Sequence, residues 1–433
     1  MRASEPKRVQ ITRLHVDGYG QDDGHQIAVF GALPGESVLA QPFTRKRKKI
    51  YAKATSIESG SPDRVTPICA AADYCGGCSL QHLSPVRQIE FKLEQLLAAL
   101  SNSPPAAVMS PLVGPVRGYR TKARLGVKYV EKKERVLVGF REKMAPFIAE
   151  IDRCEVLAPP MDSLISVLAG FIGGLEAKRS IPQIEVAVGE TRTALVFRHL
   201  EALSAGDLSK FSDFGKEQGI EIYLQPKGPD STRPLSLLDS PNRTDTLLGY
   251  SLPAFGLEYE FHPLEFTQIN QAINRLLVDL VVKELALDQN DVVLDLFCGI
   301  GNFTLPVAKN CNTVIGIEAS SASVARARTN ARLNEVDNCS FLEADLFARE
   351  PHFPPDFRAN KVLLDPPRSG ALEVCKRLAS HKVERVVYVS CNPLTLARDA
   401  QLLVESGYRL DKAGVIDMFP HTTHVESIAC FSR

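Results

Sequence analysis

The chain has 433 residues, 44% of them hydrophobic, and its formal net charge at pH 7 is +0. This length and apolar content are enough to bury two or three separate cores. A neutral chain does not attract nucleic acid through its overall charge, so any such affinity must come from local basic patches. Because the chain contains no tryptophan, stacking on bases would fall to Tyr, Phe, His or Arg.

Residues 1–61 are rich in short apolar runs and turns. Asp17-Gly18-Tyr19-Gly20 and Leu33-Pro34-Gly35-Glu36 punctuate these runs, a pattern typical of a small β-barrel. Both turns resemble those of the TRAM domain, an OB-like barrel that binds RNA. Residues 1–60 hold ten Lys/Arg against six Asp/Glu, with the excess concentrated at 45–49. That basic run is either a solvated face or, as the resemblance implies, a phosphate-binding face that reads no sequence.

Residues 62–256 predict an α+β unit. Ser84 and Pro85 indicate the start of a helix, with serine as the N-cap and proline at the first helical position. Further strands are expected over residues 184–188, 194–198 and 220–224. Alternating cations on one predicted strand would share a face, which is either solvated or in contact with RNA. These cations are Arg120, Lys122 and Arg124.

Four cysteines in this unit have the spacing of a metal site. They are Cys69, Cys75, Cys78 and Cys154. Four thiolates around a Cys-x-x-Cys core suit either tetrahedral zinc or an iron–sulfur cluster. The spacing alone leaves both open, and the rest of the chain disfavours a disulfide.

Residues 257–433 contain apolar runs that end in polar or Gly-rich turns. Residues 292–297 precede Gly299 and Gly301, which permit a tight turn and a close approach of the backbone to a ligand. Glu318 ends the next run, where an acidic side chain suits a ribose diol. Asp345 closes the third run and would bound an adenine pocket. This pattern suits either a dinucleotide or S-adenosylmethionine.

A thiol and a carboxylate follow two later apolar runs. Cys391 comes after residues 386–389, and Asp365 comes after residues 362–364. Residues just past the carboxyl ends of neighbouring parallel strands face the same crevice. The two groups, next to the glycine turn, therefore predict an active site rather than part of a core.

Four motifs together resemble the uracil-C5 RNA methyltransferase family: DLFCGIGNF (295–303), DPPRSG (365–370), SCNP (390–393) and HTTHVE (421–426). The match covers most of residues 257–433. It implies a Rossmann-like catalytic domain over 257–433 and S-adenosylmethionine as the cofactor. It also implies the residues that line the cofactor pocket: Gln268, Phe297, Asn302, Glu318, Asp345 and Asp365.

The chemistry of this family explains two of these motifs. Uracil C5 is too weak a nucleophile to attack a methyl sulfonium unaided, but a thiolate adding at C6 makes C5 an enolate carbon. Cys391 is the predicted thiolate. Glu426, which resembles the family's base, is predicted to remove the C5 proton afterwards. Asp365 would hold either the uracil edge or the cofactor's amine, and the uracil would have to be flipped out of its stack.

The resemblance also bears on the metal and on the substrate. The spacing of Cys69, Cys75, Cys78 and Cys154 resembles the branch of the family that carries a [4Fe–4S] cluster. Methylation needs no electron transfer, so the cluster is expected to hold an RNA-binding domain in shape. A TRAM domain together with a cluster resembles the branch that acts on bacterial 23S ribosomal RNA, which is the expected partner. No apolar segment is long enough to span a membrane, and a monomer in the reducing cytoplasm is expected.

The expected fold is therefore a multidomain α/β chain with a TRAM barrel at 1–61, a cluster-bearing α+β domain at 62–256 and a Rossmann-like domain at 257–433. Three other functions stay open. The target could be another uridine of ribosomal or transfer RNA. Asp365-Pro366-Pro367 could instead hold an exocyclic amine for methylation, which would need neither Cys391 nor Glu426. The chain could also be an RNA assembly factor whose methyltransferase domain is idle.

Overall fold

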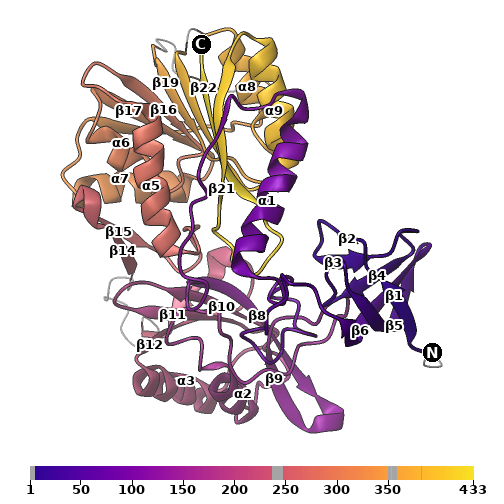
Figure 1. Ribbon diagram of the computed structural model, residues 1–433. Coiled ribbons are helices and arrows are strands. Elements are labelled where there is room, and N and C mark those ends of the chain that lie inside the picture. Colours follow the sequence, from indigo (N-terminus) through magenta and orange to yellow (C-terminus); the bar gives the residue numbers. More distant parts are fainter. Residues whose placement is uncertain (1–4, 237–246, 350–352, 354–357, 382) are drawn as a thin grey trace.

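Three large sheets and one two-stranded sheet organise the chain, which we describe from a computed structural model (Figure 1). The structure describes residues 5–236, 247–349, 353, 358–381 and 383–433. Within these ranges, no helix has both the length and the apolar composition to cross a bilayer.

The N-terminal unit is a six-stranded sheet in the order β1-β5-β6-β4-β3-β2. Its strands are β1 (Lys7–Gln10), β2 (Arg13–Leu14), β3 (Tyr19–Gln21), β4 (Ile27–Phe30), β5 (Ser37–Lys46) and β6 (Lys49–Ser59). The core is small and made largely of Val and Ala side chains, among them Val29 and Val38. Arg45, Arg47 and Lys48 are exposed at the tip of the β5–β6 hairpin, so the basic run projects into solvent.

The central unit is built on a second six-stranded sheet, in the order β13-β12-β11-β10-β8-β9. Its elements are β8 (Lys122–Val130), β9 (Arg135–Gly139), α2 (Ile165–Gly173), β10 (Gln183–Val188), β11 (Thr193–Arg198), α3 (Ala205–Gln218), β12 (Ile220–Gln225) and β13 (Arg233–Pro234). Strands at all three expected positions are confirmed. Ile165 and Leu168 of α2 and Phe211 of α3 are fully buried in the same core cluster as the inward side chains of the sheet. One face of the sheet is therefore covered by helices.

The C-terminal unit confirms the expected α/β fold. Its eight-stranded sheet has the order β18-β17-β16-β19-β20-β22-β21-β7. The elements are α5 (Gln271–Leu285), β16 (Val292–Leu296), α6 (Thr304–Ala308), β17 (Thr313–Glu318), α7 (Ser321–Leu333), β18 (Cys339–Glu343), β19 (Lys361–Leu364), α8 (Leu372–Ala379), β20 (Arg385–Ser390), α9 (Pro393–Glu405), β21 (Arg409–Ile416) and β22 (Glu426–Ser432). The first five strands of the sheet are mutually parallel, whereas β22 runs antiparallel to both of its neighbours.

Two elements from residues 62–256 are part of the C-terminal unit: a helix that packs on its sheet and a strand that pairs at the sheet's edge. They are α1 (Pro85–Ala99), which begins at the predicted residue, and β7 (Ala107–Val108). α1 lies beside α9 (Figure 1) and buries Leu96 among side chains of the C-terminal unit. Its fully buried Lys92 donates to Asp417 Oδ1 at 2.7 Å, and β7 pairs with β21 at the sheet edge. The helix and the edge strand therefore connect the central unit to the C-terminal sheet.

A short connection links the central and C-terminal units. It includes β14 (Leu248–Leu252) and β15 (Leu257–Phe261). Elsewhere, the described residues also form the short 3-10 helices η1 (Leu100–Asn102), η2 (Glu131–Lys133) and η3 (Pro229–Ser231), and η4 (Pro253–Phe255) lies between β14 and β15. The Lys122 ammonium donates to the carbonyls of Pro263 and Glu265 at 2.7 and 2.5 Å. Arg120, Lys122 and Arg124 do not all share one surface. Lys122 and Arg124 line one pocket, where the segment after β15 lies over the Lys122 ammonium, whereas Arg120 precedes β8 and lines a separate cavity.

Candidate active site

The predicted functional residues of the C-terminal unit lie at one edge of its sheet. Phe297 follows β16, Glu318 ends β17, Asp345 lies just beyond β18, Asp365 follows β19 and Cys391 follows β20. Because these five strands are parallel, all five positions lie at their carboxyl ends. Ligands of open α/β sheets bind at this edge.

The local sequence places the Cys391 thiol in a tight turn between a strand and a helix. Asn392 caps α9, its Oδ1 accepting the backbone N–H of Leu394 at 3.1 Å, and Pro393 begins the helix. The Asn392 amide also donates to the carbonyl of Arg368 at 3.0 Å. The turn that carries the thiol is thus tied to the turn after Asp365.

Strand register brings Glu426 level with Cys391. Ser390 of β20 pairs with Ser427 of β22, so one further step along the antiparallel pair puts residues 391 and 426 side by side. The Glu426 side chain is buried, and this burial, together with the charge of Asp365, raises the pKa of its carboxyl to about 8. Burial, followed by the charges of Glu426 and Asp365, raises the pKa of Cys391 to about 11. The three groups therefore form one electrostatically coupled cluster.

Asp365 connects this cluster to the segment that leads into α5. The Gln268 amide donates to Asp365 Oδ2 at 3.4 Å. Burial, reinforced by the charge of Asp295, raises the pKa of Asp365 to about 7. A buried carboxyl in this range can accept a hydrogen bond when ionised or donate one when protonated.

The glycine turn and the end of β17 form the other half of the site. Glu318 Oε2 accepts the backbone N–H of Gly299 at 3.3 Å, so the acidic side chain lies against the turn. Phe297, Gly299 and Gly301 all have positive φ, which lets the backbone turn sharply here. The rings of Phe297 and Phe347 lie 5.5 Å apart, and the N–H of Phe347 donates to Asp345 Oδ1 at 2.9 Å.

Comparison with known proteins assigns this arrangement to a family. Residues 252–433 match the family model described as tRNA (Uracil-5-)-methyltransferase. A Methylococcus capsulatus protein named 23S rRNA (uracil(1939)-C(5))-methyltransferase RlmD is 47% identical, over 99% of this chain and 98% of its own. An Alkalilimnicola ehrlichii protein of the same name is 46% identical, over 99% and 97% respectively. The chain belongs to the family of uracil-C5 RNA methyltransferases.

A solved structure of the same family has the same architecture. The Pyrococcus abyssi tRNA (uracil-54, C5)-methyltransferase, in complex with S-adenosyl-L-homocysteine, is similar with a TM-score of 0.75 and 27% identity. The similarity covers 98% of this methyltransferase and 100% of the other chain. The resemblance predicted from the four motifs is therefore confirmed.

The methyltransferase has a buried carboxylate that the sequence did not place in the site. Asp295 lies within β16; its Oδ2 accepts from the Thr304 hydroxyl at 2.5 Å, while its Oδ1 has no partner among the described residues. Burial raises the pKa of Asp295 to about 7. A charged residue inside an otherwise apolar strand was the available signal. Such a buried, unpaired oxygen at a ligand-binding edge is suited to accept a hydrogen bond from a ligand.

Asn302, predicted in the cofactor pocket, has its side chain committed to protein contacts. Its Oδ1 accepts from the Tyr250 hydroxyl at 2.9 Å and from the Asn274 amide at 3.0 Å. Its own amide donates to Asn274 Oδ1 at 2.9 Å. In this arrangement Asn302 fixes the glycine turn to α5 and β14.

Arg368 and His424 form a hydrogen-bonded pair beside the Cys391 thiol. Arg368 Nη2 lies 2.9 Å from His424 Nδ1. Burial, followed by the charge of Arg368, lowers the pKa of His424 to about 4, so the ring is neutral and accepts the guanidinium N–H. Arg368 also lowers the pKa of both Cys391 and Glu426, in part offsetting the effect of burial.

The four cysteines of the predicted metal site line one small cavity of about 20 Å³, between the segment after β6 and the segment before α2. All four are free thiols. In the described part of the chain, however, no three or more His, Cys, Asp or Glu side chains lie in positions that would hold a metal ion as they stand.

The raised pKa of Cys391 predicts alkylation that accelerates with pH. A thiol with a pKa of about 11 is ionised to about one part in ten thousand at pH 7, and at a fixed pKa its thiolate fraction grows tenfold per pH unit. Labelling of Cys391 by iodoacetamide, followed by peptide mass spectrometry, is expected to accelerate from pH 7 to 9, though by less than tenfold per unit, because Glu426, whose pKa is about 8, ionises over the same range and raises the pKa of Cys391. Because ionised Glu426 raises this pKa, Glu426→Gln should label faster at pH 9. A wild-type rate that levels off below pH 8 would contradict the raised pKa.

Proposed function

We propose that this protein transfers a methyl group from S-adenosylmethionine to C5 of uracil 1939 in 23S ribosomal RNA. The observation that carries the proposal is the alignment of Cys391 with Glu426 across β20 and β22, next to Asp365. Relatives that carry this activity in their names are 46% and 47% identical over nearly the whole chain, which supports the same substrate.

The residues at the sheet edge fit the cofactor. When bound, S-adenosylmethionine supplies an electrophilic methyl group. We infer that Gln268, Phe297, Asn302, Glu318, Asp345 and Asp365 line its pocket, with Glu318 facing the ribose. Asp295 Oδ1, which has no partner among the described residues, adds an acceptor at the same edge. Asn302 would act through the backbone of the glycine turn, because its amide is held by Asn274 and Tyr250.

The coupled cluster accounts for the two halves of the reaction. The Cys391 thiolate forms a bond to C6 of the flipped uracil, and the ring electrons move to make C5 nucleophilic. After C5 has gained the methyl group, Glu426 accepts the C5 proton. The electrons of that C–H bond restore the C5–C6 double bond, and the thiolate leaves. A pKa of about 8 suits Glu426 to take and release a proton near neutral pH.

A methylation assay tests the substrate. Incubation with S-adenosylmethionine and a 23S fragment containing uracil 1939 is expected to yield 5-methyluridine, measured by nucleoside mass spectrometry. The same fragment with cytidine at that position should yield none, nor should transfer RNA. Methylation of transfer RNA alone would overturn the 23S assignment while keeping the chemistry. Methylated adenine or guanine would indicate the exocyclic-amine reaction, and binding without methylation would indicate an assembly factor.

We further infer that the N-terminal sheet is a TRAM domain that binds RNA phosphates. The exposed cations at the β5–β6 tip support this role, since contacts to phosphate raise affinity without reading sequence.

An ion pair with a buried carboxylate connects the N-terminal sheet to the segment after β6. Arg64 donates to Glu36 Oε1 and Oε2 at 2.5 and 2.6 Å, and the Glu36 side chain is fully buried.

We also infer that Cys69, Cys75, Cys78 and Cys154 hold a [4Fe–4S] cluster. Their common cavity supports the assignment, because segments far apart in sequence bring all four thiols to one place. The cluster would hold the loop between β6 and α1 against the segment before α2.

Protein prepared without oxygen is therefore expected to be brown, with broad visible absorption and equal amounts of iron and acid-labile sulfide. Cys78→Ala is expected to lose both iron and colour, because a cluster of this kind takes four cysteine ligands. Cys311→Ala, which removes a buried cysteine of the catalytic unit, should keep them. A colourless protein that contains zinc would overturn the cluster.

A further inference from the structure

The open face of the central sheet carries a row of polar side chains that the register sets side by side. Arg124 of β8 pairs with Glu185 of β10, Gln183 of β10 pairs with Arg198 of β11, and Arg198 pairs with Gln225 of β12. Directly paired residues share a face, so these side chains all lie opposite the face covered by α2 and α3.

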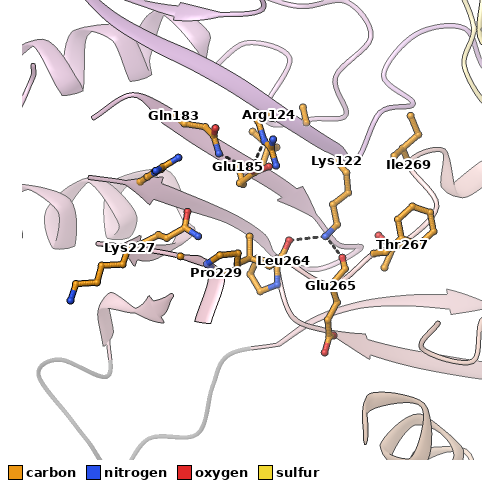
Figure 2. Close-up of a pocket in the computed structure, with 17 residues that line it drawn as sticks. Lys122, Arg124, Gln183, Glu185, Lys227, Pro229, Leu264, Glu265, Thr267 and Ile269 are labelled. Atoms are coloured by element: carbon orange, nitrogen blue, oxygen red, sulfur yellow. Dashed lines mark hydrogen bonds and ion pairs between the residues drawn. The ribbon is translucent and has the colours of Figure 1, made fainter. Parts of the chain in front are cut away.

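This face is divided into two halves. The apolar half, which includes Ala187, Val196 and Tyr223, is buried in the core cluster shared with the catalytic unit. The polar half lines a pocket of about 590 Å³, with the segment that contains Leu264, Glu265 and Thr267 on one side (Figure 2). Such a volume is in the usual range for a site that binds a nucleotide-sized group.

The pocket has more cationic than anionic side chains, and two of its cations have no partner among the described residues. Lys122 is taken up by backbone carbonyls, and Arg124 donates to Glu185 at 2.6 Å (Figure 2). Arg198 and Lys227 are exposed, and their side chains make no hydrogen bond or ion pair with any other described residue. The four cations outnumber the two lining carboxylates, Glu185 and Glu265, so the pocket favours an anion.

One wall of the pocket also belongs to the candidate active site. Residues 263–267 and Ile269 line the pocket, and Gln268, between Thr267 and Ile269, donates its amide to Asp365 in the candidate active site. Thr267, on the same wall, is buried, and its hydroxyl has no partner within the described ranges. An RNA strand whose target base lies beside Cys391 would therefore have this cationic pocket on the other side of a single loop.

We propose that this pocket binds the phosphodiester backbone of substrate RNA next to the flipped uridine, with Arg198 and Lys227 contacting the phosphates. The proposal rests on RNA being the substrate. RNA is favoured over a free nucleotide because, among the described residues, the pocket is open on one side and its two cations without a partner come from different strand ends. The contact would hold the RNA while the uridine is out of its stack.

Binding of the 23S fragment to an Arg198→Ala/Lys227→Ala variant tests this site. Affinity, measured by fluorescence anisotropy, is expected to fall about tenfold, and the slope of log affinity against log salt to decrease by about 1.4 to 1.8. The matched control is Lys210→Ala/Lys216→Ala, which removes the same charge from α3 on the covered face. Arg198→Lys/Lys227→Arg, which keeps both charges, should retain most of the affinity.

Equal losses in the pocket variant and the α3 variant would overturn the site, as would unchanged affinity of the pocket variant. A pocket variant that binds free uridine monophosphate less tightly but RNA normally would identify a small-molecule site and also overturn it. Failure of the proposed function is distinguishable. In that case the wild-type protein would bind the fragment through this pocket yet form no 5-methyluridine.

Discussion

A Cys391→Ala protein is expected to bind S-adenosylmethionine with unchanged affinity and to form no measurable 5-methyluridine. The physical reason is that uracil C5 becomes nucleophilic only while a thiolate is bonded to C6. Loss of the nucleophile should slow turnover by at least about 1,000-fold, since no neighbouring group replaces a covalent catalyst. Asp365 and Glu426 would remain beside the site, but carboxylates are much weaker nucleophiles than a thiolate.

The measurement is nucleoside mass spectrometry of the treated 23S fragment, with calorimetry for cofactor binding. Cys339→Ala is the matched control, because Cys339 is also half-buried. It begins β18 and so lies at the amino ends of the parallel strands, opposite the carboxyl ends where Cys391 stands. The Cys339→Ala protein should methylate normally. If Cys391→Ala still formed 5-methyluridine at a tenth of the wild-type rate, the covalent mechanism would be wrong, whereas methylated adenine or guanine formed by the variant would support the exocyclic-amine reaction.

A Glu426→Gln protein is expected to methylate uracil once and then remain joined to the RNA. Glutamine matches the size of glutamate and fills the same buried position, but it cannot accept the C5 proton. Proton removal by a placed base contributes about 100- to 10,000-fold, so the adduct should persist for correspondingly longer. On a denaturing gel, the protein band should shift by the mass of the RNA when S-adenosylmethionine is present.

Two further variants make the experiment specific. Glu405→Gln, at the exposed end of α9, should turn over without accumulating an adduct. Cys391→Ala/Glu426→Gln should form none, because the linking thiol is absent. If Glu426→Gln released methylated RNA at the wild-type rate, the base would be another group, and the buried Asp365 would be the next to test.

The arrangement of the strand ends could be predicted because it depends on short-range patterns. Glu318 and Asp365 follow apolar runs of strand length, and Asn392 and Pro393 mark the start of a helix directly after Cys391. In a parallel sheet each strand and the following helix form a local unit, and all carboxyl ends lie at one edge. Such residues can be assigned to one crevice without knowing which strand neighbours which.

Other features depended on contacts between distant segments. The sequence did not indicate that α1 and β7 would join the catalytic sheet, since their apolar residues are compatible with either unit. The alternation of Arg120, Lys122 and Arg124 predicted one surface, whereas the Lys122 ammonium is enclosed by the carbonyls of Pro263 and Glu265. A period-two pattern shows which side chains share a face, but not what covers that face.

The sequence by itself determined the family, and it predicted that Cys391 and the glycine turn stand at strand ends, because motifs of four to nine residues specify these features locally. Only the tertiary structure decided that Glu426 lies level with Cys391, since β22 inserts antiparallel between β20 and β21. It also decided that half of the central sheet face is polar and lines a pocket beside the candidate site. Both results depend on long-range strand pairing, whose register follows from the packing of whole units and not from any one segment.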